Sequence, residues 1–187
     1  MHPRIQEILD FFDEQYHALR AAAEAVPAAH RERQPGAGRW SVAQVMDHVA
    51  RVNTVMAQLV AGNVAQARAQ GLAQETETGS VIKTEEVAAV MDRGTRRSAP
   101  EPAHPAPDAR YDDALAALEA SRERVRETFT AADGLALGAV QFTHPALGPL
   151  NMYQWGVAAS AHQARHAAQI REAADELAGS SPEQPGA

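Results

Sequence analysis

Two histidines, His162 and His166, stand four residues apart near the C-terminal end of the chain. On a helix they project from one face, about one turn apart. The rest of that face is apolar: Trp155, Ala159, Ile170, Ala173 and Leu177. His48 lies on a similar apolar stripe far upstream. Three imidazoles on two inward-facing helical surfaces can hold one divalent metal ion and leave a coordination position open.

The same histidines can also be read as partly buried core residues that neighbouring groups satisfy. Their position on an apolar face favours the metal, because a buried imidazole without a partner costs free energy. Other histidine sites fit less well. Gln163 replaces the glutamate that a zincin motif places after its first histidine, and no Glu-x-x-His pair suggests a di-iron site.

The composition excludes several classes of function. Lys and Arg number 17 against 24 Asp and Glu, a formal charge of -7, which argues against a nucleic-acid or anionic-membrane surface. There is no cysteine, so disulfides, cysteine metal sites and a cysteine nucleophile are excluded. No apolar run approaches the roughly 20 residues that span a bilayer, and the N-terminus lacks a signal-peptide core. We expect a cytoplasmic protein.

Hydrophobic periodicity predicts four long helices, over about 4–26, from 42 to about 61 or somewhat beyond Gly62, 112–132 and 152–178. Two of them begin with a capping box, Ser41 with Gln44 and Asn151 with Gln154. The predicted fold is all-α, a four-helix bundle in a single domain of residues 1–178. Residues 179–187 are expected to form a flexible tail.

The connection between the second and third helices, residues 69–110, is unusually long. It contains a short helical candidate at 84–91 and then a stretch with four prolines, which predicts an extended crossover or lid. Residues 135–150 are expected to be a loop. His144 in this loop could be a second-shell or substrate contact at the site mouth, or an ordinary turn residue.

Five residues near the candidate ligands have more than one interpretation. Trp40 and Trp155 are expected to be core side chains that staple helix starts. Asp47 is expected to be an exposed carboxylate, and Arg165 to project off the ligand face. Gln169 could orient a ligand or water, although a solvated or packing role is slightly favoured.

Two blocks of sequence resemble one known family. The segment W-S-V-A-Q-V-M-D-H-V, residues 40–49, is similar to the W-S…H-[LV] block of the DinB/YfiT-like superfamily. The segment H-P-A-L-G-P-L-N-M-Y-Q-W, residues 144–155, followed by H-x-x-x-H-x-x-Q-I, resembles its C-terminal block. The two blocks occur in the family's order, and the resemblance covers nearly the whole chain.

The resemblance implies a four-helix bundle with one divalent metal, often Zn or Ni, held by His48, His162 and His166. It also implies a homodimer. Characterised relatives include transferases that use a low-molecular-weight thiol (bacillithiol, mycothiol or glutathione) and thiol-dependent isomerases. Gln44 stands where the family commonly has Glu. This difference does not affect the expected metal ligands, because Gln44 has a capping role.

Three functions follow as hypotheses. The first is a metal-dependent transferase that activates a low-molecular-weight thiol for attack on a small electrophile. The second is a metal-dependent hydrolase that activates water at the same site. The third is a non-catalytic, metal-stabilised dimeric stress-response protein. We expect a small-molecule substrate and neither a nucleic-acid nor a membrane partner. No side chain beyond the three candidate ligands and His144 is assigned a role in the chemistry.

Overall fold

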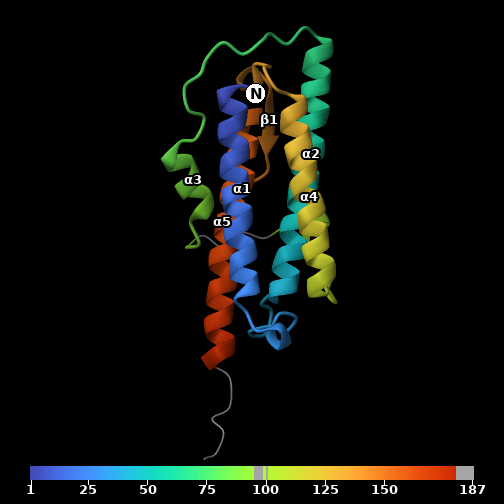
Figure 1. Cartoon of the computed structure of the whole chain (residues 1–187), viewed down its shortest axis with the longest axis vertical. Coiled ribbons are helices and arrows are strands. Elements are labelled where there is room, and N and C mark those ends of the chain that lie inside the picture. The colour runs from blue at the N-terminus through green and yellow to red at the C-terminus, as the bar shows by residue number, and fades with distance from the viewer. Residues whose placement is uncertain (95–98, 100, 180–187) are drawn as a thin grey trace, which may run out of the picture.

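The computed structural model describes residues 1–94, 99 and 101–179. Four long helices run side by side: α1 (Pro3–Glu24), α2 (Val42–Ala69), α4 (Tyr111–Ala131) and α5 (Met152–Gly179) (Figure 1). A shorter helix, α3 (Thr84–Met91), packs against α5. A two-stranded sheet, β1 (Gln141–His144) and β2 (Gly148–Asn151), precedes α5. The structure is therefore mainly helical, as predicted, with one small sheet.

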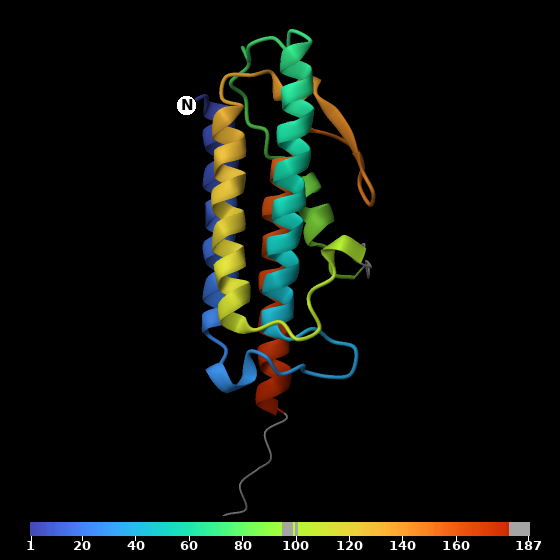
Figure 2. The ribbon, with the colours of Figure 1, turned by 90° about the vertical axis from the view of Figure 1, so that its right-hand side faces the viewer.

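The long helices contact one another in a cycle, because α1 packs on α5, α5 on α2, α2 on α4 and α4 on α1. The crossover, residues 70–110, leaves the end of α2 and contains α3, and its described residues 101–110 lead into α4 (Figures 1 and 2). It includes one 3-10 turn, η2 (Glu101–Ala103). None of the described helices has the length and apolarity that crossing a membrane requires. The expectation of a flexible tail falls on residues outside the described part, apart from Gly179, which ends α5.

Both predicted capping boxes are present. The Gln44 N–H donates to Ser41 Oγ at 3.2 Å, and the Ser41 N–H donates to Gln44 Oε1 at 3.0 Å. Asn151 and Gln154 make the same reciprocal pair at 2.9 and 3.0 Å. Each box satisfies two helix-end donors and fixes where its helix begins. The starts of the two histidine-bearing helices are thus set by local sequence.

The all-α prediction was wrong for residues 141–151, which form an antiparallel hairpin instead of a loop. Its register pairs Gln141 with Asn151 and His144 with Gly148, and Gly148 has a φ of 81° that favours glycine. The strands are four residues long, too short for a clear alternating pattern. The hairpin stands out from the long helices (Figure 2).

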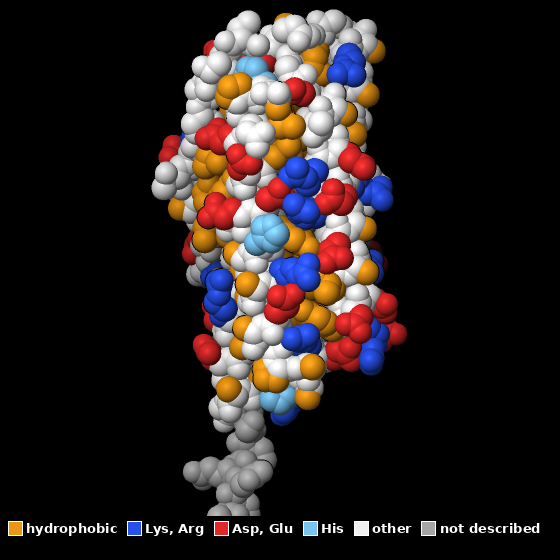
Figure 3. Space-filling view, in the orientation of Figure 1, with side chains coloured by type: hydrophobic (Ala, Val, Ile, Leu, Met, Phe, Trp, Pro, Cys, Tyr) orange, Lys and Arg blue, Asp and Glu red, His pale blue; other side chains and the backbone are white. Residues whose placement is uncertain are grey.

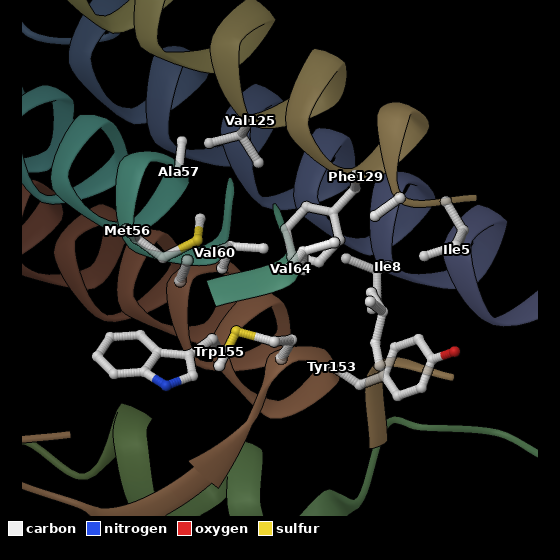
Figure 4. Close-up of a cluster of buried hydrophobic side chains, with 14 of the residues drawn as sticks. Ile5, Ile8, Met56, Ala57, Val60, Val64, Val125, Phe129, Tyr153 and Trp155 are labelled. Atoms are coloured by element: carbon white, nitrogen blue, oxygen red, sulfur yellow. The ribbon is translucent and has the colours of Figure 1, made fainter. Parts of the chain in front are cut away.

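Among the described residues, the core consists of two apolar clusters, one toward each end of the long helices. Figure 4 shows the cluster nearer the hairpin, which contains Ile8, Phe12, Val60, Phe129 and Met152. The second contains Leu19, Val45, Leu118 and Ile170. Between them lies a layer of fully or almost fully buried polar side chains, here called the central polar layer: Asn53, Ser121, Ser160 and Gln163.

A buried carboxylate fixes the crossover close to where it leaves α2. Glu75 accepts hydrogen bonds from Arg4 Nη1 at 3.0 Å and from the Tyr153 hydroxyl at 2.7 Å. Burial alone would raise the pKa of Glu75, but these bonds and the Glu77 N–H hold that pKa at about 2. The charged carboxylate therefore joins α1, the crossover and α5 across the neutral pH range.

Candidate metal centre

The structure brings His48 of α2 together with His162 and His166 of α5. His162 Nε2 lies 3.3 Å from His48 Nε2 and 3.0 Å from His166 Nε2, and one nitrogen from each of the three lies within 4.8 Å of the others. Three nitrogens bound to a tetrahedral ion at about 2.1 Å would be about 3.4 Å apart. The three predicted ligands are therefore grouped at a separation that a metal ion fits.

The tautomers of two of these rings are set by their second nitrogens. His48 Nδ1 lies 2.6 Å from the Ala103 carbonyl oxygen, and His166 Nδ1 lies 2.8 Å from Gln169 Oε1. Because these oxygens can only accept, both Nδ1 atoms carry the proton and both Nε2 atoms present lone pairs. His162 stands between them and can donate one proton at most. A cation bound where the Nε2 lone pairs of His48 and His166 converge would accept both of them.

The three imidazoles are neutral at physiological pH. Burial lowers the pKa of His162 to about 3, and the charges of His48, Arg165 and His144 act in the same direction. Burial, followed by the neighbouring His162 and His48, also brings the pKa of His166 well below its usual value. The pKa of His48 is lowered by burial as well. Neutral imidazole is the form that ligates a metal.

The crossover covers the α2 side of this site. Ala103, which accepts from His48, belongs to η2. Two neighbours of His48 hold the same segment, because Gln44 Nε2 donates to the Pro107 carbonyl at 3.0 Å and Asp47 Oδ2 accepts from the Ala106 N–H at 2.8 Å. The prediction of an exposed Asp47 carboxylate was wrong, since the carboxylate is only 14% exposed. Nothing in the local sequence places the crossover on this face.

The crossover also contacts the helix that carries the other two histidines. Arg165 of α5 donates to the carbonyls of Val90 and Asp92, so it projects off the ligand face as predicted and reaches the end of α3. In the opposite direction, Arg93 donates to Glu172 at 2.9 Å and to the Arg165 carbonyl at 3.4 Å. The crossover therefore bridges both histidine-bearing helices.

Both tryptophans contact histidine rings. Trp40 is partly buried and packs on the second apolar cluster, and its ring also lies 4.8 Å from that of His48. Its contact with a candidate ligand was not foreseen, nor was the weaker one between Trp40 and His104 at 6.5 Å. Trp155 is buried, as expected for a core side chain, and its Nε1 donates to the Phe142 carbonyl at 3.2 Å.

His144 holds the turn of the hairpin. Its Nδ1 accepts from the N–H groups of Ala146 and Leu147 at 3.1 and 3.2 Å, and its ring lies 4.8 Å from that of Trp155. It belongs to none of the groups of close metal-binding atoms among the described residues. These contacts support the interpretation of His144 as a turn residue, and the charge of His144 also lowers the pKa of His162.

Comparison with protein-family models gives a match to the DinB superfamily over residues 12–170. The chain belongs to the DinB superfamily. The matched region contains both blocks of sequence that resemble the family and all three histidines of the site. The comparisons with curated proteins and with solved structures give no match. Within this DinB-superfamily chain, three histidines on α2 and α5 could hold one metal ion.

Proposed function

We propose that this DinB-superfamily protein holds one divalent metal ion, Zn or Ni, through His48, His162 and His166. We further propose that it catalyses transfer of a low-molecular-weight thiol to a small electrophile. The observation that carries the proposal is the convergence of three Nε2 atoms, two of them with lone pairs fixed by Nδ1 contacts. The fold that presents them is proposed to be a four-helix bundle, with the crossover as its lid.

The chain's own residues would bind and orient the reactants. A bound metal ion lowers the pKa of a thiol and stabilises the thiolate near neutral pH. Because the chain has no cysteine, the thiol must come from a second molecule. Its proton passes to solvent, the sulfur forms a bond to carbon, and the leaving group departs with the electron pair of the broken bond. The crossover, docked on both histidine-bearing helices, would limit water at the site.

The test is thiol-dependent conjugation of a chromogenic electrophile, measured with bacillithiol, mycothiol and glutathione in turn. We expect one of these thiols to stimulate turnover by the Zn or Ni form, and His48→Ala to reduce that turnover at least about tenfold. His17→Ala is the matched control, because His17 is an exposed histidine of α1. Absence of stimulation by every thiol contradicts the transferase.

The same assay separates the two remaining functions. Thiol-independent hydrolysis of esters or amides that is lost in His48→Ala would identify a hydrolase. A protein that takes up the metal and gains thermal stability, but turns over neither class of substrate, would be the non-catalytic alternative.

A further inference from the structure

The central polar layer crosses the long helices at one level. On one side, Asn53 Nδ2 of α2 donates to Ser121 Oγ of α4 at 3.5 Å. On the other, Gln163 Nε2 of α5 donates to the Phe12 carbonyl of α1 at 3.3 Å. Both helix pairs are therefore joined by a hydrogen bond between polar groups in an otherwise apolar interior.

An ion pair shows that the two hydrogen bonds share this level. Arg122 follows Ser121 on α4, Asp13 follows Phe12 on α1, and Arg122 Nε lies 2.8 Å from Asp13 Oδ1. The layer also marks the boundary between the apolar clusters. On α5, Ala159 belongs to the cluster near the hairpin and Ala167 to the other.

The candidate metal ligands of α5 lie in this same interval. His162 directly precedes Gln163, and both His162 and His166 fall between the two apolar clusters. The contact that holds α5 to α1 is therefore made by the residue next to a ligand. Any axial displacement of α5 at Gln163 displaces His162 by the same amount.

Global stability does not account for the layer. Asn53 and Gln163 are both 0% exposed, and Asn53 Oδ1 and Gln163 Oε1 have no hydrogen-bond partner among the residues that the structure describes. A buried acceptor left unpaired costs about 1–3 kcal/mol. Apolar side chains of similar volume would avoid this cost.

A buried polar layer can fix the axial register of one helix against its neighbours. Around the ligands the inner surface of α5 is rich in alanine, including Ala159, Ala161, Ala164 and Ala167, and at this level such small side chains offer few interlocking contacts that resist sliding. A displacement by one residue would move His162 about 1.5 Å along the helix and turn it by about 100°. Metal–ligand distances vary by only about 0.2 Å in real sites. A buried polar contact is a known means of fixing one register at the expense of stability.

We infer that Asn53, Ser121 and Gln163 are positioning residues of the metal centre. The Asn53–Ser121 contact holds α2 against α4 and the Gln163 contact holds α5 against α1, in the axial register at which the Nε2 atoms of His48, His162 and His166 converge. The inference rests on the proposed metal-binding function. It assigns to the layer a role in metal affinity that differs from any role in stability, and the two properties can be measured separately.

The test is a triple variant, Asn53→Leu, Ser121→Ala and Gln163→Met, which removes the polar atoms and approximately keeps the volume. We measure its thermal unfolding without metal and its binding of Co²⁺, whose visible absorption reports coordination geometry. The melting temperature should stay the same or rise, because unpaired buried acceptors are lost. The Co²⁺ dissociation constant should increase about 10–100-fold, with a changed spectrum.

Val60→Ala is the control. Val60 is fully buried in the apolar cluster near the hairpin, so its truncation lowers stability without touching the layer. Its Co²⁺ affinity should equal that of the unmodified protein. Gln163→Met alone is measured in parallel and decides the matter if the triple variant does not fold.

Two outcomes overturn the inference, and they are distinguishable. If the layer variants bind Co²⁺ with unchanged affinity and spectrum, the layer does not position the ligands, whereas the metal centre itself stands. If the unmodified protein binds no Co²⁺ at all, the proposed metal-binding function fails first and the inference fails with it.

Discussion

Two side-chain contacts at the residue scale give the histidine cluster its chemical direction. The Ala103 carbonyl and Gln169 Oε1 hold the Nδ1 protons of His48 and His166, so the Nε2 lone pairs of both rings face His162. A cluster of core histidines that merely satisfied one another would need a donor for each acceptor. Here the acceptors outnumber the donor that His162 can supply.

Gln169→Leu tests the role of one of these contacts. Loss of the acceptor frees the His166 ring to adopt the other tautomer, so the affinity for Zn²⁺ should fall about 10–100-fold. Gln66→Leu, at an exposed position of α2, provides the matched control. Competition titration with a chromogenic chelator measures both. Equal affinities in the two variants would show that Gln169 merely packs beside His166.

Stability of the metal-free protein should depend on pH through the same rings. In the unfolded chain a histidine has a pKa of about 6.5, whereas burial lowers the folded pKa of His162 to about 3 and also lowers the pKa values of His166 and His48. Below about pH 6.5 the unfolded state therefore binds more protons, so the free energy of unfolding falls as the pH falls from 6.5 toward 3.

Urea unfolding at about pH 5 and pH 7.5 in the presence of a chelator measures this dependence. The Glu75 carboxylate, whose pKa is about 2, does not interfere, because its contribution changes only below its unfolded value of about 4.5. We expect lower stability at pH 5, and a smaller difference in His162→Phe. Equal stability of the unmodified protein at the two pH values would contradict burial of neutral imidazoles.

At the scale of the elements, the packing of α5 depends on one close approach to α1 and α4. At Gly156 of α5, an added Cβ would lie 2.8 Å from Ile8 Cγ2 of α1 and 2.8 Å from Phe129 Cζ of α4. Ile8 and Phe129 are both fully buried and cannot move freely. Gly156→Ala should therefore lower the free energy of unfolding by about 1–3 kcal/mol, although Ala favours helix.

Gly62→Ala is the matched control for that substitution. Gly62 lies in α2 with no atom within 4 Å of an added Cβ, so alanine should stabilise the protein by up to about 1 kcal/mol. Chemical denaturation gives both values. If Gly156→Ala were also stabilising, the helices would not be as closely packed at this level as the structure has them.

Local sequence signals predicted several of these elements. The elements that were not predicted lack such a signal. The capping boxes at Ser41 and Asn151 and the apolar periodicity located the helices that carry the site. The prediction that α2 could continue beyond Gly62 agrees with its end at Ala69, because Gly62 lies in open space and is tolerated within the helix. The hairpin was not predicted because its strands are short. The hydrogen bond from Trp155 Nε1 to the Phe142 carbonyl of β1 is a tertiary contact, which local sequence does not reveal.

The candidate site also contains residues that the sequence predicted and residues that it did not. His162 and His166 are paired by helix geometry alone, and the block around Trp40 and Ser41 pointed to His48. The covering groups were not predictable, because Ala103, Ala106 and Pro107 reach the site through the path of the crossover. That path is determined by distant contacts such as those of Glu75 and Arg93, which no local pattern reveals.

At the scale of the whole molecule, the crossover joins the two histidine-bearing helices, with α3 on α5 and η2 on α2. The face in Figure 3 shows acidic and basic side chains interspersed. That face has no large patch of one charge. The ion pairs of the molecule include Arg122 with Asp13 and Arg20 with Glu24. The proposed function rests on the interior site between α2 and α5, where the three histidines lie.

Elemental analysis of the purified protein, combined with its melting temperature before and after chelation, tests the metal centre most directly. We expect about one Zn or Ni ion per chain, a lower melting temperature once the ion is removed, and loss of both properties in His48→Ala. A purified protein without stoichiometric divalent metal, whose melting temperature a chelator leaves unchanged, would contradict the metal centre.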